Sequence, residues 1–217
     1  MTKSNRTKVI VVALIVLVAI AAILGMLKFA RENKNYGFQP GIHDTLFPNA
    51  RTIQPFSLRG GDGSTFTEHS LKGHWSVVFF GYTHCPDICP TTMGIMNKVW
   101  QQLTPAAQSK IQMVFVSIDP ERDSPEAIEK YATYFNPHFQ AVTGNETQLK
   151  QFSQQVGVAY FKVESENIEG GVNENYIINH TGSLMLFNPL GQYAGVISPP
   201  LSVEKISHEL ERIVHTQ

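Results

Sequence analysis

Two cysteines are the residues of this chain best suited to chemistry. Cys85 and Cys89 are the only cysteines among 217 residues, and they lie in the segment C-P-D-I-C-P directly after the apolar run 75–80. In the first turn of a helix, a spacing of four residues puts both side chains on one face, with Cβ atoms about 5 to 6 Å apart. The two thiols can therefore share a soft metal ion or act as a redox couple. A structural disulfide is a further alternative, although so short a loop stabilises a fold little by chain entropy.

The placement of these cysteines follows from the elements around them. The run 75–82 is mostly Val and Phe without polar alternation, which predicts a strand buried on both faces. Apolar residues then recur at helical spacing across 91–103, which predicts an amphipathic helix. One thiol is thus expected in the loop after a strand. The other is expected in the first turn of a helix, whose amino-terminal partial positive charge favours the thiolate.

The rest of the sequence predicts a mixed sheet with crossover helices. Further strands are expected at 111–118, 139–143, 160–163, 176–178, 183–188 and 192–197, further helices at about 125–135, 145–156 and 203–214, and a short hairpin at 56–66. Buried parallel strands with crossover helices, followed by an antiparallel pair, indicate an α/β sandwich with helices on both faces of the sheet. This order of elements, with thiols at the amino end of the first helix, resembles the thioredoxin fold.

A histidine supplies the best third ligand for a metal ion. His180 lies in the turn N-H-T-G before the strand expected from Ser183, and in a thioredoxin-like sheet this turn faces the amino end of the first helix. Thioredoxin-type oxidoreductases have a cis-proline there, whereas this chain has no proline from 139 to 188. Two sulfurs and one imidazole nitrogen suit Cu(I), with Cu(II) also possible, and Zn(II) remains open.

The other histidines are weaker candidates for a ligand. His84 ranks second. It is adjacent to Cys85, but neighbouring side chains in an extended loop point apart. Six are expected in loops or on a polar helix face, in contact with solvent: His43, His69, His74, His138, His208 and His215.

At this point the motifs resemble a known family. The segments F-F-G-Y-T-H-C-P-D-I-C-P, V-S-I-D-P-E-R-D and Y-I-I-N-H-T ahead of L-F-N-P are similar to those of the Sco/SenC family of membrane-anchored copper proteins, over about 54–214. The resemblance implies that Cys85, Cys89 and His180 bind copper. It also implies a role in assembling the dinuclear copper centre of a cytochrome c oxidase subunit, by delivering copper or by reducing that subunit's cysteines. One departure is Asn179, where the family usually has Asp, which puts fine-tuning of the site in doubt but not ligation.

The resemblance leaves the type of activity open. The leading hypothesis is a copper metallochaperone whose partners are the copper-centre subunit of the oxidase and another copper chaperone as donor. The alternative is a membrane-anchored thiol-disulfide oxidoreductase, in which Cys85 attacks a disulfide and Cys89 resolves it, so that both thiols are catalytic. A peroxiredoxin-like peroxidase is a third and weaker hypothesis. Such an enzyme usually needs a Thr and an Arg around its reactive Cys, and Thr83 with the distant Arg122 is thin support.

Several acidic residues near these motifs have both a structural and a functional interpretation. Asp87 lies between the thiols and either tunes them, faces a partner or initiates the helix. Asp119 and Asp123 are expected to be turn and helix-start residues, with an acidic feature near the site as the alternative. The acidic loop 164–174 is expected to be solvated, and it is also a candidate docking surface.

The amino-terminal region predicts a membrane anchor. Every residue from Val9 to Leu27 is apolar or Gly, and a helix of that length spans roughly 28 Å, close to the thickness of a bilayer's hydrocarbon core. A cleaved signal peptide is the alternative, but its apolar region is usually only about 7 to 15 residues long. The expected organisation is a cytoplasmic tail at 1–8, a transmembrane anchor at 9–29, a tether at 30–53 and a thioredoxin-like copper-binding domain at 54–217.

Orientation and compartment follow from this layout and from the composition. Because a short tail precedes the anchor and the folded body follows it, we expect a single-pass protein of the inner, cytoplasmic membrane with its domain facing the periplasm. The formal net charge is -1, and charged residues make up only 16% of the chain. This composition has no basic surface for a nucleic acid, so we expect no nucleic-acid partner.

Overall fold

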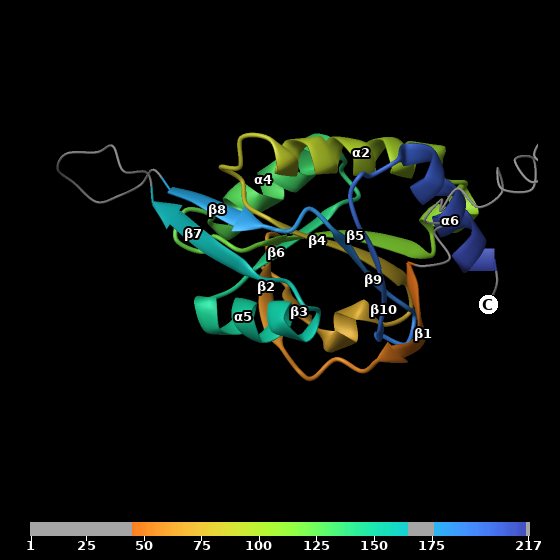
Figure 1. Cartoon of the computed structure of the whole chain (residues 1–217), viewed down its shortest axis with the longest axis horizontal. Helices are drawn as coiled ribbons and strands as arrows, with labels where there is room; N and C mark the ends of the chain where they lie inside the picture. Colours follow the sequence, from red (N-terminus) through yellow and green to blue (C-terminus); the bar gives the residue numbers. More distant parts are fainter. Residues whose placement is uncertain (1–44, 165–175, 216–217) are drawn as a thin grey trace, which may run out of the picture. The chain divides into compact units, whose positions relative to one another are not determined.

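The computed structural model describes residues 45–164 and 176–215. All of them belong to one compact unit, 42–217. This unit is built on an eight-stranded sheet with the strand order β1-β10-β9-β4-β5-β6-β2-β3, and β7 and β8 form a separate two-stranded sheet (Figure 1). The strands are β1 (Leu46–Arg51), β2 (Ser57–Gly60), β3 (Thr65–Thr67), β4 (Trp75–Gly81), β5 (Ile111–Ser117), β6 (Gln140–Thr143), β7 (Tyr160–Glu164), β8 (Tyr176–His180), β9 (Leu184–Phe187) and β10 (Tyr193–Ile197).

The centre of the sheet is parallel and fully buried. β4 pairs in parallel with β5, which pairs in parallel with β6. Every residue of β4 and β5 is buried, as expected for strands covered by helices on both faces. β9 runs antiparallel to β4 and begins at Leu184, opposite Phe79. The residues that precede β9 therefore lie at the same sheet edge as the residues that follow β4.

Helices cover both faces of the sheet. Figure 1 shows α2 and α4 on one side and α5 on the other. The helices are η3 (Glu68–Leu71), α2 (Ile88–Gln102), α3 (Pro105–Gln108), α4 (Pro125–Phe135), α5 (Glu146–Gln155) and α6 (Val203–His215). On the α5 side, the buried Phe152 stacks on Phe56, with ring centroids 4.2 Å apart, and also packs against Phe80 and Phe187. The expected α/β architecture, a mixed sheet with helices on both faces, is confirmed.

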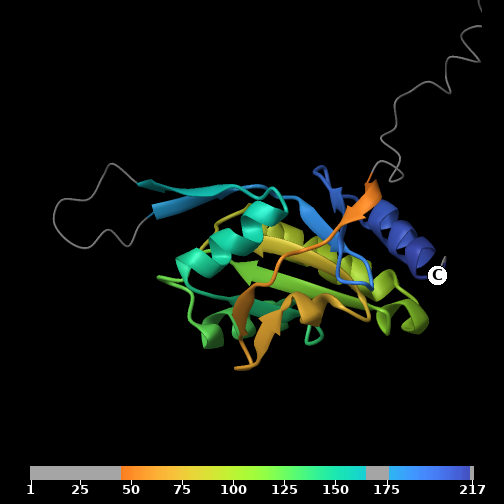
Figure 2. The same cartoon turned by 90° about the horizontal axis from the view of Figure 1, so that it is seen from below.

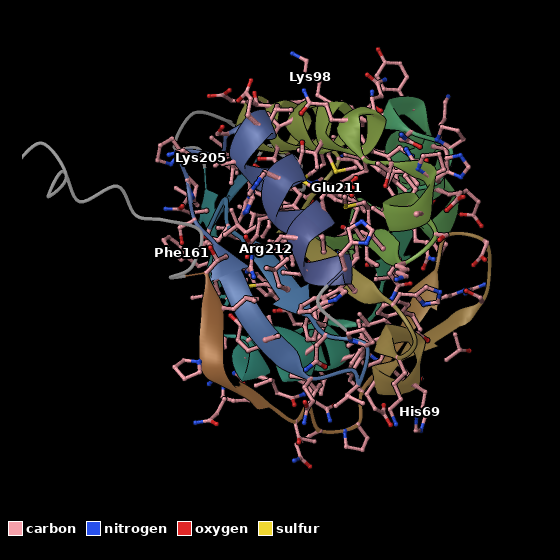
Figure 3. All side chains as sticks on the ribbon, turned by 90° about the vertical axis from the view of Figure 1, so that its right-hand side faces the viewer. His69, Lys98, Phe161, Lys205, Glu211 and Arg212 are labelled. Carbon is pink, nitrogen blue, oxygen red and sulfur yellow. The ribbon has the colours of Figure 1, made fainter. Side chains whose placement is uncertain are left out.

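The carboxyl-terminal helix α6 packs against α2 and is hydrogen-bonded to the turn that follows α2. Figure 3 faces α6 and labels Lys205, Glu211 and Arg212 on it. The Glu211 carboxylate accepts hydrogen bonds from the backbone N–H and the hydroxyl of Thr104, at 2.5 and 3.2 Å. Thr104 in turn caps α3 by accepting a bond from the Ala107 N–H. This contact joins the last helix to the α2–α3 connection.

The two-stranded sheet forms an arm, which we call the β7–β8 arm and define as residues 160–164 and 176–180. Its strands are antiparallel, with Tyr160 opposite His180 and Glu164 opposite Tyr176. Figures 1 and 2 show the arm extending from one end of the main sheet. Phe161, Val163 and Ile177 are exposed on it, whereas Ile178 is buried. The arm thus has one apolar face toward solvent and one face toward the domain.

The expected elements are confirmed with small shifts at their ends, and three elements were not expected. Leu46–Arg51 lies within the predicted tether at 30–53, but the structure shows it as edge strand β1, paired with β10. Pro48 is compatible with an edge strand, because one side of such a strand needs no ladder hydrogen bonds. The short helices η3 and α3 were also not predicted.

The predicted tail 1–8 and anchor 9–29 lie outside the described residues. Within 45–164 and 176–215, none of the helices has the length and apolar character needed to cross a bilayer. The acidic loop predicted at 164–174 also lies outside this range, apart from Glu164 at the end of β7.

Candidate metal centre

The two cysteines lie where β4 leads into α2, as the sequence predicted. Cys85 is in the loop after Gly81, and Cys89 is the second residue of α2. Both are free thiols, 9% and 0% exposed respectively. The Asp87 side chain makes no capping bond at the start of the helix, and the Cys89 backbone N–H donates instead to the Cys85 sulfur at 3.4 Å. The Cys85 sulfur therefore accepts a hydrogen bond that a capping oxygen accepts in other helices.

His180 reaches the same place from the end of β8. Its Nε2 atom lies 3.3 Å from the Cys89 sulfur, and its Nδ1 atom lies 3.0 Å from the Thr181 carbonyl oxygen. A carbonyl only accepts hydrogen bonds, so Nδ1 donates to Thr181 and Nε2 is the ring atom that faces the thiols. Nε2 is therefore the nitrogen that a metal ion at the thiols would meet, with Nδ1 held by the backbone.

The imidazole is packed in place by aromatic rings. The Phe79 and Tyr82 rings have centroids 6.0 and 5.9 Å from that of His180. Tyr82 is almost completely buried, and its hydroxyl accepts a hydrogen bond from the Ile178 backbone N–H at 3.2 Å. Tyr82 thus contacts both the His180 imidazole and β8, the strand that ends in His180.

Gly81 leaves room for the second sulfur. A Cβ atom at this position would lie 2.8 Å from the Cys89 sulfur, closer than real Cβ contacts come, and 3.0 Å from the Phe115 ring, which is tighter than most of them. Only glycine lets the last residue of β4 approach the thiol so closely.

The two thiols have opposite protonation states. Hydrogen bonds lower the pKa of the Cys85 thiol to about 4, the largest from the Cys89 side chain and others from the Asp87 and Cys89 backbone N–H groups. The pKa of Cys89 is raised, because its S–H donates to the Cys85 thiolate and because it is buried. Without metal, the pair is therefore one thiolate and one thiol at neutral pH.

The three predicted ligands converge in the structure. The sulfurs of Cys85 and Cys89 and a ring nitrogen of His180 all lie within 4.8 Å of one another. Two sulfurs and an imidazole nitrogen are a soft donor set that fits Cu(I) and, less closely, Cu(II) or Zn(II). The residues present therefore fit a copper ion.

His84 belongs to a second cluster, with two carboxylates instead of the thiols. Its exposed ring lies 3.5 Å from a carboxylate oxygen of Asp123, and ligand atoms of His84, Asp119 and Asp123 lie within 4.8 Å of one another. Both carboxylates are already occupied. Asp123 accepts hydrogen bonds from the N–H and hydroxyl of Thr83 and from the hydroxyl of Ser117, and Asp119 accepts one from Arg122.

The acidic residues of the sequence motifs therefore have structural partners. Asp119 and Asp123 are buried, at 0% and 2% exposure, so they are more than the turn and helix-start residues that were expected. Asp123 connects the cysteine loop to β5 through Thr83 and Ser117. Asp87, in contrast, is exposed at the start of α2. Thr83 and Arg122, which a peroxidase would need beside its reactive thiol, are instead bonded to Asp123 and Asp119.

Two contributors to the site were not predicted: Gly81 and Tyr82. Both adjoin the cysteine motif, and a glycine ending a buried strand was the available signal for a close approach.

Comparison with known proteins agrees with this geometry. Residues 45–215 match the family described as SCO1/SenC. An SCO2-like protein of Rickettsia prowazekii is 34% identical over 193 residues, which cover 88% of this chain and 89% of that protein. The structure of Bradyrhizobium japonicum ScoI with copper bound is similar, with 30% identity, a TM-score of 0.65, and coverage of 74% of this chain and 99% of that one. The apo Sco1 protein of Thermus thermophilus is also similar, with 30% identity, a TM-score of 0.69, and coverage of 79% and 96%.

Proposed function

The chain belongs to the SCO1/SenC family, and from this premise we propose that it is a copper metallochaperone whose cargo is bound by Cys85, Cys89 and His180. The observation that carries the proposal is the convergence of two sulfurs and one imidazole nitrogen within 4.8 Å. The copper bound in the similar Bradyrhizobium japonicum protein supports the choice of metal.

The protonation and the placement of the three ligands suit a cargo rather than a permanent cofactor. Cys85 is already a thiolate at neutral pH, so it offers a first ligand without losing a proton. Cys89 must release its proton when the metal binds, because thiolate is the ligand form. His180 lies on the β7–β8 arm, outside the eight-stranded sheet, whereas both cysteines follow β4 of that sheet, so the three ligands come from two separate parts of the fold.

The recipient follows from the family resemblance. The proposed recipient is the copper-centre subunit of a cytochrome c oxidase, whose dinuclear centre accepts copper, and the proposed donor is another copper chaperone. The proposed location is the periplasmic side of the inner membrane, with residues 9–29 as the anchor. The apolar stretch of the sequence supports this location, and so does the resemblance to a family of membrane-anchored proteins.

A second function is favoured by the lowered pKa of one thiol. The Cys85 thiolate can attack a disulfide of a partner, forming a mixed disulfide and releasing one partner thiolate, which takes up a proton. Cys89 then loses its proton and displaces the second partner sulfur, so that Cys85 and Cys89 are oxidised to a disulfide and the partner is reduced to a dithiol. This reaction requires both cysteines but not His180.

Single variants separate the two functions. The chaperone proposal predicts one bound copper per chain, and it predicts loss of tight binding in Cys85→Ser, Cys89→Ser and His180→Ala, measured by metal analysis and competition with a copper chelator. His74→Ala is the matched control, because His74 is exposed at the opposite end of β4. Unchanged affinity in His180→Ala would contradict this ligand set, and disulfide-reduction activity that survives in the same variant would support the reductase.

A further inference from the structure

A buried charged cluster fastens the β7–β8 arm to the domain. Asp119 is completely buried and accepts a hydrogen bond from Arg122 Nε at 2.6 Å and another from the Tyr176 hydroxyl. Arg122 also donates from Nη1 to the Tyr176 backbone oxygen at 3.0 Å, and its guanidinium lies 3.6 Å from the centroid of the Tyr176 ring. We call these three residues the Asp119–Arg122–Tyr176 cluster. Hydrogen bonds to buried charged groups are stronger than neutral ones, so this is the strongest attachment described for the arm.

The cluster acts on the strand that ends in the histidine ligand. Tyr176 is the first residue of β8 and His180 is the last, so the two lie about 13 Å apart along an extended strand. Other contacts to the domain also support this strand and its partner. Among them are the hydrogen bond from the Ile178 N–H to the Tyr82 hydroxyl and an ion pair between Lys162 and Glu121 at 2.5 Å. The ion pair is largely exposed and contributes little.

The turn at 119–123, which holds Asp119 and Arg122, is also bonded to the cysteine loop. Asp123 lies four residues after Asp119, and it accepts hydrogen bonds from the N–H and the hydroxyl of Thr83, two residues before Cys85. Residues 119–123 are therefore bonded to both halves of the site, to the cysteine loop through Asp123 and to the arm through Asp119 and Arg122. Any shift of the arm relative to this turn changes the distance between His180 and the thiols.

The same bonds argue against a second metal site here. The carboxylate oxygens of Asp119 accept bonds from Arg122 and Tyr176, and those of Asp123 accept bonds from Thr83 and Ser117. A cation at this place would have to displace these donors and would lie beside the Arg122 guanidinium. The arrangement therefore suits a connection between two parts of the protein better than a ligand set.

We propose that Tyr176, through Asp119 and Arg122, is a positioning residue that sets the place of His180 relative to Cys85 and Cys89. The proposal rests on the proposed function, because it assigns a role to His180 as a copper ligand. Tyr176 touches no copper ligand in the structure and acts through the backbone of β8. Its contribution therefore depends on His180 being present.

The first experiment measures the arm itself, without copper. In Tyr176→Phe the ring stays and the hydroxyl bond to Asp119 is lost. Amide hydrogen exchange of Ile178 is then expected to become roughly tenfold faster, equivalent to about 1.4 kcal/mol, while the amides of β4 and β5 exchange as in the wild type. Tyr160→Phe is the matched control: Tyr160 lies opposite His180 on the same arm, and its buried hydroxyl has no partner among the described residues. Unchanged exchange in Tyr176→Phe, or equal acceleration in both variants, would overturn the proposal.

The second experiment measures copper affinity in a double-mutant cycle. Tyr176→Phe is expected to weaken copper binding about tenfold when His180 is present, and by less than about twofold in the His180→Ala background. Equal weakening in both backgrounds would show a general structural effect and refute positioning through His180. If His180→Ala alone binds copper as tightly as the wild type, the proposed ligand set fails, whereas faster Ile178 exchange in Tyr176→Phe would still show that Tyr176 fastens the arm.

Discussion

The opposite protonation states of the two thiols predict an unusual pattern of chemical reactivity. With a pKa of about 4, Cys85 is almost entirely thiolate at pH 7, whereas a free cysteine with a pKa of about 8.5 is roughly 3% thiolate. This difference raises the thiolate fraction about 30-fold. A less basic thiolate is also a weaker nucleophile, and a Brønsted coefficient of about 0.45 over roughly 4.5 pKa units lowers its intrinsic rate about 100-fold. At pH 7 we therefore expect Cys85 to react about threefold more slowly than a free thiol, before any effect of its burial.

The assay is alkylation of the copper-free protein by iodoacetamide between pH 3 and pH 9, with the modified residue identified by mass spectrometry. The rate at Cys85 should be constant above about pH 5.5 and should fall tenfold per pH unit below about pH 4, because the thiolate is lost on protonation. Cys89, which is buried and protonated, should remain unmodified under the same conditions.

Two variants test the cause of the lowered pKa. Cys89→Ser keeps a hydroxyl donor beside Cys85, so the midpoint of the rate profile should stay low. Cys89→Ala removes the largest of the hydrogen bonds that lower the pKa, so the midpoint should rise. A wild-type midpoint near pH 8, or modification of Cys89 before Cys85, would refute the assigned protonation states.

Three further predictions follow from the geometry of the site. Gly81→Ala should destabilise the protein by about 1–3 kcal/mol through overpacking against the Cys89 sulfur and should weaken copper binding; urea unfolding and copper titration measure the two effects, and an unchanged affinity would contradict the close approach. Asp123→Ala should lower the free energy of unfolding by about 3 kcal/mol, because buried donors lose their acceptor; a change below about 0.5 kcal/mol would contradict its buried role. Because the folded-state pKa of Cys85 is lowered, its thiolate contributes stability that is complete above about pH 8.5 and is lost as the pH falls toward 4. In urea unfolding of the copper-free protein, the free energy of unfolding should therefore fall more steeply between pH 8.5 and pH 4 in the wild type than in Cys85→Ser. Equal pH dependence in the two proteins would contradict the lowered pKa of Cys85.

Sequence reasoning recovered those parts of the molecule that local patterns determine. β4 and β5 are long apolar runs, and the helices carry regular apolar spacing or strong starts such as Ser124-Pro125, so their positions follow from neighbouring residues. His180 was predicted to face the thiols from its place in the turn before a strand, and the antiparallel pairing of β9 with β4 places it there. In these cases secondary structure and topology together determine which residues meet.

The missed features depend on contacts between distant segments. β1 contains Pro48 and has no polar alternation, so only its pairing with β10 identifies it as a strand. Asp119 and Tyr176 are 57 residues apart, and their bond depends on how the β7–β8 arm packs against the turn after β5. Turn preferences describe Asp119 correctly as a turn residue, but they give no information on its burial or on the partner that it binds.

X-ray absorption at the copper edge of the loaded protein reports whether two sulfurs and one nitrogen of this chain bind one copper ion. We expect two sulfur neighbours from Cys85 and Cys89 and one imidazole nitrogen, with the nitrogen signal lost in His180→Ala and retained in His74→Ala. A copper shell without sulfur, or an imidazole signal that persists in His180→Ala, would refute this ligand set.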